Sequence, residues 1–321
     1  TQSNLILGGL PFGSSLNKEE SFNFLDYAYE NGVRDFDTGT LYGNGQSELI
    51  LGAFRKINNI HLNFHTKIGL NRTLRNDGSF GVEISSLTPE YIYQEVVGSC
   101  DRLQVSNIKR VTLHAFSNTV PLYDQINALS KLINSNTIDS YGLANFTPGQ
   151  LSKWLQICQE HSLPLPSHFD CHFNLLEQRA RYQIMPLIQH NGVKLVPYRV
   201  LCRGLLAGRY KSSVNLPAGS RAQNSWRVKN VVTDENIALL STIESFASAS
   251  NATLLDIVFL WTLAFSSINQ ICIGTSSKFQ LSEIMGSLRK LNDYNNFNII
   301  DSLDNILPNA VSKNPSVYFE T

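Results

Sequence analysis

The sequence predicts a closed barrel of eight parallel β-strands, each followed by a helix. Three observations lead to this fold class. Short apolar runs typical of buried strands alternate with amphipathic helical patterns along nearly all of the 321 residues. Such alternation indicates parallel strands joined by right-handed crossovers. It repeats eight times, which favours a (β/α)8 TIM barrel over an open sheet.

The expected elements follow in order along the chain. Strands are expected near residues 5–9, 33–37, 61–67, 110–114, 139–143, 168–173, 193–198 and 268–273. Helices are expected at 18–31, 47–57, 88–103, 121–134, 147–161, 178–190, 234–265 and 278–291. Thr88-Pro89 and Thr147-Pro148 support this phasing, because each joins a capping hydroxyl to a proline suited to the first helical turn.

We expect a single domain over residues 1–321, with a C-terminal extension at about 293–321 that holds a weak helix at 295–307. No linker, low-complexity tract or repeat divides the chain. Two connections are long, 69–87 after the third strand and 207–233 after the seventh. Both leave the C-terminal ends of strands, where active sites of such barrels form, so functional loops are expected there.

Composition excludes several classes of function. Lys+Arg and Asp+Glu both number 26, and this zero net charge argues against a nucleic-acid partner. No run approaches the roughly 18 apolar residues of a membrane span, and the first residues show no export signal. The five cysteines are scattered without a Cys-x-x-Cys pair, which predicts a reduced cytoplasmic protein with no disulfide or metal framework.

Four polar residues, Asp37, Tyr42, Lys67 and His114, lie at or just after the ends of apolar runs. Since the carboxyl ends of parallel strands meet at one mouth, we expect these side chains to collect there. A tyrosine hydroxyl, with an ordinary pKa of about 10, donates a proton poorly near neutrality unless it is assisted. A neighbouring ammonium lowers that pKa.

This set of groups fits the reversible reduction of a carbonyl. Lys67 would lower the pKa of Tyr42, the proton donor, and Asp37 would hold Lys67 charged and oriented. His114 would polarise the substrate oxygen by a hydrogen bond. No side chain donates hydride, so a nicotinamide coenzyme is implied.

Around these residues the chain resembles the aldo-keto reductase superfamily, from about Leu7 to about residue 291. The segments that carry the resemblance are Asp37-Thr38-Gly39-Thr40-Leu41-Tyr42-Gly43, Ser47-Glu48, Leu51-Gly52, Thr66-Lys67 and Leu113-His114. It implies a (β/α)8 barrel, an Asp–Tyr–Lys–His catalytic tetrad at the four positions above, and NAD(P)-dependent oxidoreductase activity on CH–OH or C=O groups.

The resemblance also implies a coenzyme site, with departures. Asn145 keeps the asparagine of the family's Gly-x-Ser-Asn-Phe, but Ala144 replaces its serine. Asp170 stands where the family has glutamine, and an ionised carboxylate accepts but does not donate. Its charge suits a positive oxidised ring better than a neutral reduced one. Tyr198 matches the tyrosine that stacks on nicotinamide, and we hypothesise that Arg199 pairs with Asp170.

Further coenzyme contacts are implied in the glycine-rich segment after the seventh strand and at the start of the last helix. They are Leu201, Gly204, Leu206, Gly274, Thr275, Ser276, Gln280 and Glu283. The family often has arginine at the Gln280 position and asparagine at the Ile284 position, and both are absent here. We expect NADP(H) because the family usually uses it, and NAD(H) remains open.

The substrate side is marked less clearly. Phe12 and Phe116 follow the first and fourth strands, and Trp226 lies in the long 207–233 connection, so these aromatics are candidates to line or close the pocket. Arg72 and Arg75 are candidates to attract an anionic substrate, and a solvated loop explains them equally well. The 69–87 insertion resembles the subgroup that acts on sugars and pyridoxal, which implies a small polyhydroxylated substrate.

We therefore expect a monomer or small homo-oligomer that acts on a small carbonyl or sugar substrate. Two alternatives stay open. Asp170 favours a sugar 1-dehydrogenase that works oxidatively. The other is a non-catalytic nucleotide-binding regulatory subunit, against which the intact set of four polar residues argues.

Overall fold

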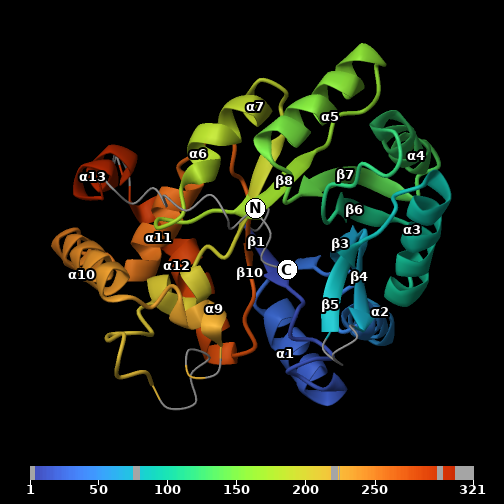
Figure 1. Cartoon of the computed structure of the whole chain (residues 1–321). Helices are drawn as coiled ribbons and strands as arrows, with labels where there is room; N and C mark the ends of the chain where they lie inside the picture. Colours follow the sequence, from blue (N-terminus) through green and yellow to red (C-terminus); the bar gives the residue numbers. More distant parts are fainter. Residues whose placement is uncertain (1–3, 75–79, 218–222, 224, 295–298, 308–321) are drawn as a thin grey trace.

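The structure is a computed structural model that describes residues 4–74, 80–217, 223, 225–294 and 299–307. The expectations for Arg75 and for the extension beyond residue 307 lie outside the described residues. Within them, eight parallel strands surround a central axis, with helices on the outside (Figure 1). The strands are β1 (Leu5–Gly8), β2 (Asp35–Asp37), β3 (Asn63–Ile68), β6 (Ile108–Leu113), β7 (Ile138–Ala144), β8 (His168–His172), β9 (Lys194–Tyr198) and β10 (Ile271–Ile273).

The strand order is β10-β1-β2-β3-β6-β7-β8-β9, with all pairs parallel. The two ends of this sheet meet through an isolated parallel bridge between Leu195 and Ile268, where the Leu195 N–H donates to the Ser267 carbonyl at 2.8 Å. This contact joins β9 to the segment that leads into β10. The predicted (β/α)8 barrel is therefore confirmed.

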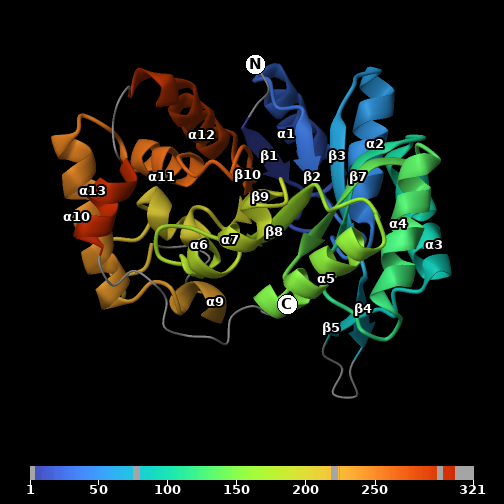
Figure 2. The same ribbon diagram turned by 90° about the horizontal axis from the view of Figure 1, so that it is seen from above.

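The helices cover the outside of the barrel, as the view from above shows (Figure 2). Their bounds are α1 (Lys18–Glu30), α2 (Gln46–Asn58), α3 (Pro89–Leu103), α4 (Leu122–Asn134), α5 (Pro148–Glu160), α6 (Arg179–Gln183), α7 (Met185–Gln189), α9 (Trp226–Lys229), α10 (Asp234–Ala249), α11 (Leu254–Leu263), α12 (Lys278–Lys290) and α13 (Ile299–Ile306). Thr88 and Thr147 cap α3 and α5, as their sequence predicts.

Two expected helices are each split into two. Residues 178–190 form α6 and α7, because Pro186 lacks the N–H that would continue the first helix. Residues 234–265 form α10 and α11, which meet at 93°. The break contains Asn251 in the left-handed region at φ 52°, and Thr253 then caps α11.

No single helix of the described chain is long and apolar enough to cross a membrane; by length and composition alone, the bent pair α10–α11 passes the same test.

The long connections also have structure of their own. Residues 69–87 contain an antiparallel hairpin of β4 (Leu70–Leu74) and β5 (Phe80–Ile84), where we expected a loop. Its side chains after Leu70 are mostly exposed, so it lacks the apolar alternation that would reveal a strand pair. The chain after β9 forms the 3-10 helix η1 (Cys202–Ala207), and the connection that follows holds α9.

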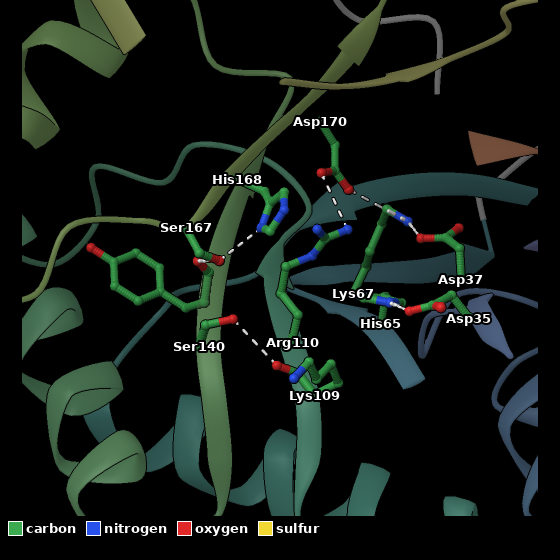
Figure 3. Close-up of polar contacts among 11 residues, drawn as sticks. Asp35, Asp37, His65, Lys67, Lys109, Arg110, Ser140, Ser167, His168 and Asp170 are labelled. Atoms are coloured by element: carbon green, nitrogen blue, oxygen red, sulfur yellow. Dashed lines mark hydrogen bonds and ion pairs between the residues drawn. The ribbon is translucent and has the colours of Figure 1, made fainter. Parts of the chain in front are cut away.

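The inside of the barrel is unusually polar. On β2, β3, β6 and β8, residues of alternate positions face inward, and Figure 3 shows the ionisable side chains among them directed toward one another. These residues are Asp35, Asp37, His65, Lys67, Arg110, Thr112, His168 and Asp170. All but His168 are buried, so the strands bring ionisable groups together where water is scarce.

Candidate active site

A cavity of about 410 Å³ opens at the carboxyl ends of the strands. It is lined by Gly8, Leu10, Asp37, Leu41, Tyr42, Lys67, Leu70, His114, Ala115, Ala144, Asn145, Asp170, Val196, Tyr198, Arg199, Arg227, Cys272 and Gly274. The four residues proposed from the sequence as a catalytic set all line it. Its position is the one at which barrels of this kind carry their chemistry.

Lys67, on β3, donates a hydrogen bond to the carboxylate of Asp37 at the end of β2. A second carboxylate, Asp170, lies 4.0 Å from the same ammonium. Burial is the largest single influence and lowers the pKa of Lys67, but Asp37, Tyr42, Asp170 and Cys272 together raise it by more, so the net pKa lies above its ordinary value. Lys67 is therefore a permanent cation in the cavity.

Tyr42 and His114 face each other across the cavity, with ring centroids 6.1 Å apart in an edge-to-face arrangement. The Lys67 ammonium lies 5.7 Å from the Tyr42 ring centroid. Burial raises the pKa of Tyr42, and Lys67 opposes that rise. Burial and the charge of Lys67 lower the pKa of His114 to about 3, so its imidazole is neutral near pH 7. A phenol and a neutral imidazole can both hydrogen-bond a substrate oxygen here.

Beneath these groups lies a buried cation that was not among the residues predicted from the sequence. Arg110, on β6, is 1% exposed, and its Nη2 atom lies 3.6 Å from Asp170 Oδ1 (Figure 3). We expected Arg199 to be the partner of Asp170. In the described part of the chain, the cations within 4.0 Å of this carboxylate are instead Arg110 and Lys67, because both point inward from their strands whereas Arg199 follows the end of β9.

A sequence signal for Arg110 was present. Side chains of a strand alternate between its two faces, so residues 110, 112 and 114 share a face. His114 had already been placed at the mouth, and counting back by twos leads to Arg110. The same count leads from Lys67 to His65 and from Asp37 to Asp35.

Next to His114, an amide and a phenol form one hydrogen-bonded unit. The Asn145 side-chain amide donates to the His114 carbonyl at 2.9 Å, and its oxygen accepts from the Tyr198 hydroxyl at 2.5 Å. Asn145 adopts the left-handed region at φ 62°, which asparagine tolerates better than most residues. The Tyr198 ring stacks on His172 at 6.1 Å, and its position is thereby held.

The expected contacts after β9 take a form that the sequence did not indicate. Leu201 is half-buried, whereas Gly204 and Leu206 are buried within η1. The Gly204 and Leu206 N–H groups both donate to the Leu201 carbonyl, at 2.8 and 3.2 Å. These two amides, which belong to the residues expected to contact the coenzyme, therefore stabilise the turn itself.

The start of α12 gathers the remaining expected residues. Thr275 donates to the Gln280 side chain at 2.7 Å, while Ser276 and Glu283 are exposed. Gly274 lines the cavity, and a side chain at its position would meet open space. These residues therefore lead from the cavity outward to the N-terminus of α12. The free N–H groups at a helix N-terminus favour the binding of an anion.

The three aromatic residues expected near the substrate do not line the cavity. Phe12 is 0% exposed and packs against Phe24, because the turn after β1 directs it into the core. Phe116 is half-buried with its ring on Phe146. Trp226 is 58% exposed at the start of α9.

The described cavity wall instead includes three leucines, Leu10, Leu41 and Leu70, and Arg227. Arg72 lies outside this cavity, in a neighbouring polar pocket, with its guanidinium group 3.8 Å from the Phe80 ring centroid.

The donor set favours an organic coenzyme over a metal ion. The described residues contain no group of three or more His, Cys, Asp or Glu side chains able to hold a metal. Asp170 lines the cavity, and its carboxylate can accept hydrogen bonds but cannot donate them when ionised. A nicotinamide carboxamide carries N–H donors that suit such an acceptor, so the residues present fit that group.

Comparison with known proteins agrees with this geometry. The aldo/keto reductase family model matches residues 4–305. The versiconal hemiacetal acetate reductase of Aspergillus parasiticus is 23% identical over 310 residues, which cover 89% of each chain. The structure of a glycerol dehydrogenase from Gluconobacter oxydans is similar with a TM-score of 0.81 and 22% identity, covering 99% of this chain and 95% of that one. The chain therefore belongs to the aldo/keto reductase family and is an NAD(P)-dependent oxidoreductase acting on carbonyl or alcohol groups.

Proposed function

We propose that this enzyme transfers hydride between NADP(H) and a carbonyl or alcohol group of a small, polyhydroxylated substrate. One observation carries the proposal: the ammonium of Lys67, paired with Asp37, lies in a cavity that Tyr42 and His114 also line. That arrangement joins a proton donor, a cation that assists it and a neutral hydrogen-bonding imidazole.

Each of the four residues has its own role in the proposal. Tyr42 gives its phenolic proton to the substrate oxygen during reduction and takes it back during oxidation. Lys67 lowers the pKa of Tyr42 against the effect of burial. Asp37 keeps Lys67 charged and oriented. His114, which is neutral, hydrogen-bonds the same substrate oxygen. The nicotinamide coenzyme supplies or accepts the hydride when bound.

The residues that would hold the coenzyme extend from the cavity to the start of α12. Within the cavity these are Asn145, Asp170, Tyr198, Arg199 and Gly274. Farther out, Thr275, Ser276, Gln280 and Glu283 lie at or near the start of α12, and the expected set also includes Leu201, Gly204 and Leu206 after β9. NADP(H) is preferred in this proposal, and the uncharged Gln280 side chain keeps NAD(H) as the alternative.

The cavity supports a small substrate. Its volume of about 410 Å³ must hold both the reacting end of the coenzyme and the substrate. The names of the two relatives point to hemiacetal and polyol chemistry, which agrees with a hydroxylated compound.

All five cysteines are free thiols, which supports a reducing, cytoplasmic setting. We propose a monomer or a small homo-oligomer.

A second candidate is oxidation of a sugar hemiacetal to a lactone by the same residues. Asp170 favours it, because a carboxylate in the cavity suits a positively charged oxidised ring. The non-catalytic regulatory subunit is disfavoured, since a nucleotide-binding subunit has no need of the Lys67–Asp37 pair beside Tyr42 and His114.

The test combines coenzyme binding with one substitution. Titration of protein fluorescence with NADPH and NADH should show tight binding of one coenzyme, and an aldehyde and sugar screen then identifies turnover. Tyr42→Phe should keep coenzyme binding and lower kcat by about 10³-fold, because general acid catalysis is lost. Tyr93→Phe, an exposed tyrosine on α3, is the matched control. Full activity of Tyr42→Phe would sink the mechanism, and binding of neither coenzyme would sink the function.

A further inference from the structure

We propose that Arg110 is a positioning residue that keeps Asp170 ionised in the cavity, so that the site holds the oxidised nicotinamide coenzyme more tightly than the reduced one. The inference rests on the proposed function, because it assumes a nicotinamide ring near Asp170. It deepens that function by assigning a cause to the relative affinity for the two forms of the coenzyme.

The first step is the isolation of Arg110. Its side chain is buried in the barrel, and none of its three guanidinium nitrogens has a hydrogen-bond partner in the described part of the chain. A buried cation without compensation is strongly unfavourable. Its Nη2 atom lies 3.6 Å from Asp170 Oδ1, which makes this carboxylate its ionic partner.

The second step is that other neighbours of Arg110 cannot take this role. The pKa of His65 is lowered to about 4 and that of His168 to about 2, by burial and then by Arg110 itself, so both rings are neutral near pH 7. The Asp35 carboxylate accepts a hydrogen bond from His65 at 2.9 Å and is engaged there. Asp170 is therefore left to balance Arg110 (Figure 3).

The third step concerns the charge of Asp170. Burial raises the pKa of this carboxyl, and the neighbouring Asp37 raises it further. Arg110 is the largest influence that lowers it, followed by Lys67. Because Lys67 already donates to Asp37, removal of Arg110 takes away the main support for a charged Asp170.

The consequence falls on the coenzyme. An oxidised nicotinamide ring is positively charged and a reduced one is neutral, so a fixed carboxylate in a poorly hydrated cavity favours the oxidised form. A residue that keeps this carboxylate charged would shift the relative affinity for the two forms without touching either. Arg110 does not line the cavity, which agrees with such an indirect role.

The experiment measures dissociation constants of NADP⁺ and NADPH for the whole protein. We expect the wild type to prefer NADP⁺. Asp170→Asn and Arg110→Met should each reduce the ratio Kd(NADPH)/Kd(NADP⁺) by about tenfold or more. Arg110→Lys keeps the cation and should retain most of the ratio. If Arg110 were merely structural, both constants would change in parallel and the ratio would stay the same, which would overturn the inference.

The double variant Arg110→Met/Asp170→Asn protects the test against misfolding, because it leaves no isolated buried charge. Its ratio should match that of Asp170→Asn alone. Arg110 is proposed to act through the charge of Asp170, and Asp170→Asn has already removed that charge. A wild-type ratio in the double variant would overturn the inference while leaving the proposed function intact. Failure of the wild type to bind either coenzyme form would overturn the proposed function and this inference with it.

Discussion

Two polar layers cross the barrel two residues apart on β2, β3 and β8, and β6 adds a residue to the lower layer. The upper layer consists of Asp37, Lys67 and Asp170, which line the cavity. The lower layer consists of Asp35, His65, Arg110 and His168, which lie deeper in the barrel (Figure 3). Each layer holds an acid beside a basic group, Asp37 with Lys67 above and Asp35 with His65 below.

The difference between the layers lies in access. In the upper layer, Lys67 is held charged next to Tyr42, at a place that substrate can reach. In the lower layer, burial keeps His65 neutral, and its Nε2 atom hydrogen-bonds the Asp35 carboxylate away from the cavity. Ion-pair chemistry alone therefore does not mark a catalytic residue, because position along the strand decides whether the pair meets a reactant.

The sharpest test of this difference is a pair of identical substitutions on β2. Asp37→Asn should lower kcat/KM by about 10²-fold, because Lys67 loses its main support. Asp35→Asn should change kcat/KM by less than about threefold and instead lower the free energy of unfolding by about 1–3 kcal/mol. Steady-state kinetics and urea unfolding measure the two effects. Equal losses of activity in both variants would erase the distinction between the layers.

Histidines that are neutral in the folded chain predict a dependence of stability on pH. Four histidine pKa values are lowered: His65 to about 4, His114 to about 3, His168 to about 2 and His172 to about 3. Between pH 6.5 and these values only the unfolded chain binds the protons, so stability present above pH 6.5 is lost as pH falls. Each histidine contributes a slope of up to about 1.4 kcal/mol per pH unit.

Urea unfolding from pH 7 to pH 4.5 checks this prediction. His168→Gln should make the free energy of unfolding depend less steeply on pH, by the contribution of one histidine. His161→Gln, at an exposed position, serves as the control. An unchanged slope in His168→Gln would contradict the neutral state that we assign to the lower layer.

The smallest expected effect lies outside both layers. Gln280→Arg adds a cation at the start of α12, close to Ser276 and Ser277, and should tighten NADPH relative to NADH by about tenfold. Gln280→Met controls for loss of the Thr275 hydrogen bond. If parallel titrations show no change in the NADPH/NADH ratio, the adenosine end of the coenzyme does not lie at α12.

Periodicity along the chain determined much of the fold. The eight strands and most helices follow from apolar patterns that depend on neighbouring residues alone. The hairpin of β4 and β5 escaped prediction because its exposed strands carry no apolar alternation. The single-domain organisation stays a prediction.

The candidate site divides in the same way. Its proposed catalytic residues, Asp37, Tyr42, Lys67 and His114, were identified by their places at strand ends and by the family resemblance, both of which are read along the chain. Contacts across the barrel could not be predicted from the sequence, because they depend on which strands face each other and on how far each side chain reaches. The sequence by itself determined the barrel and the residues at its mouth. Only the tertiary structure decided that Arg110, rather than Arg199, faces Asp170 and that Phe12 packs in the core.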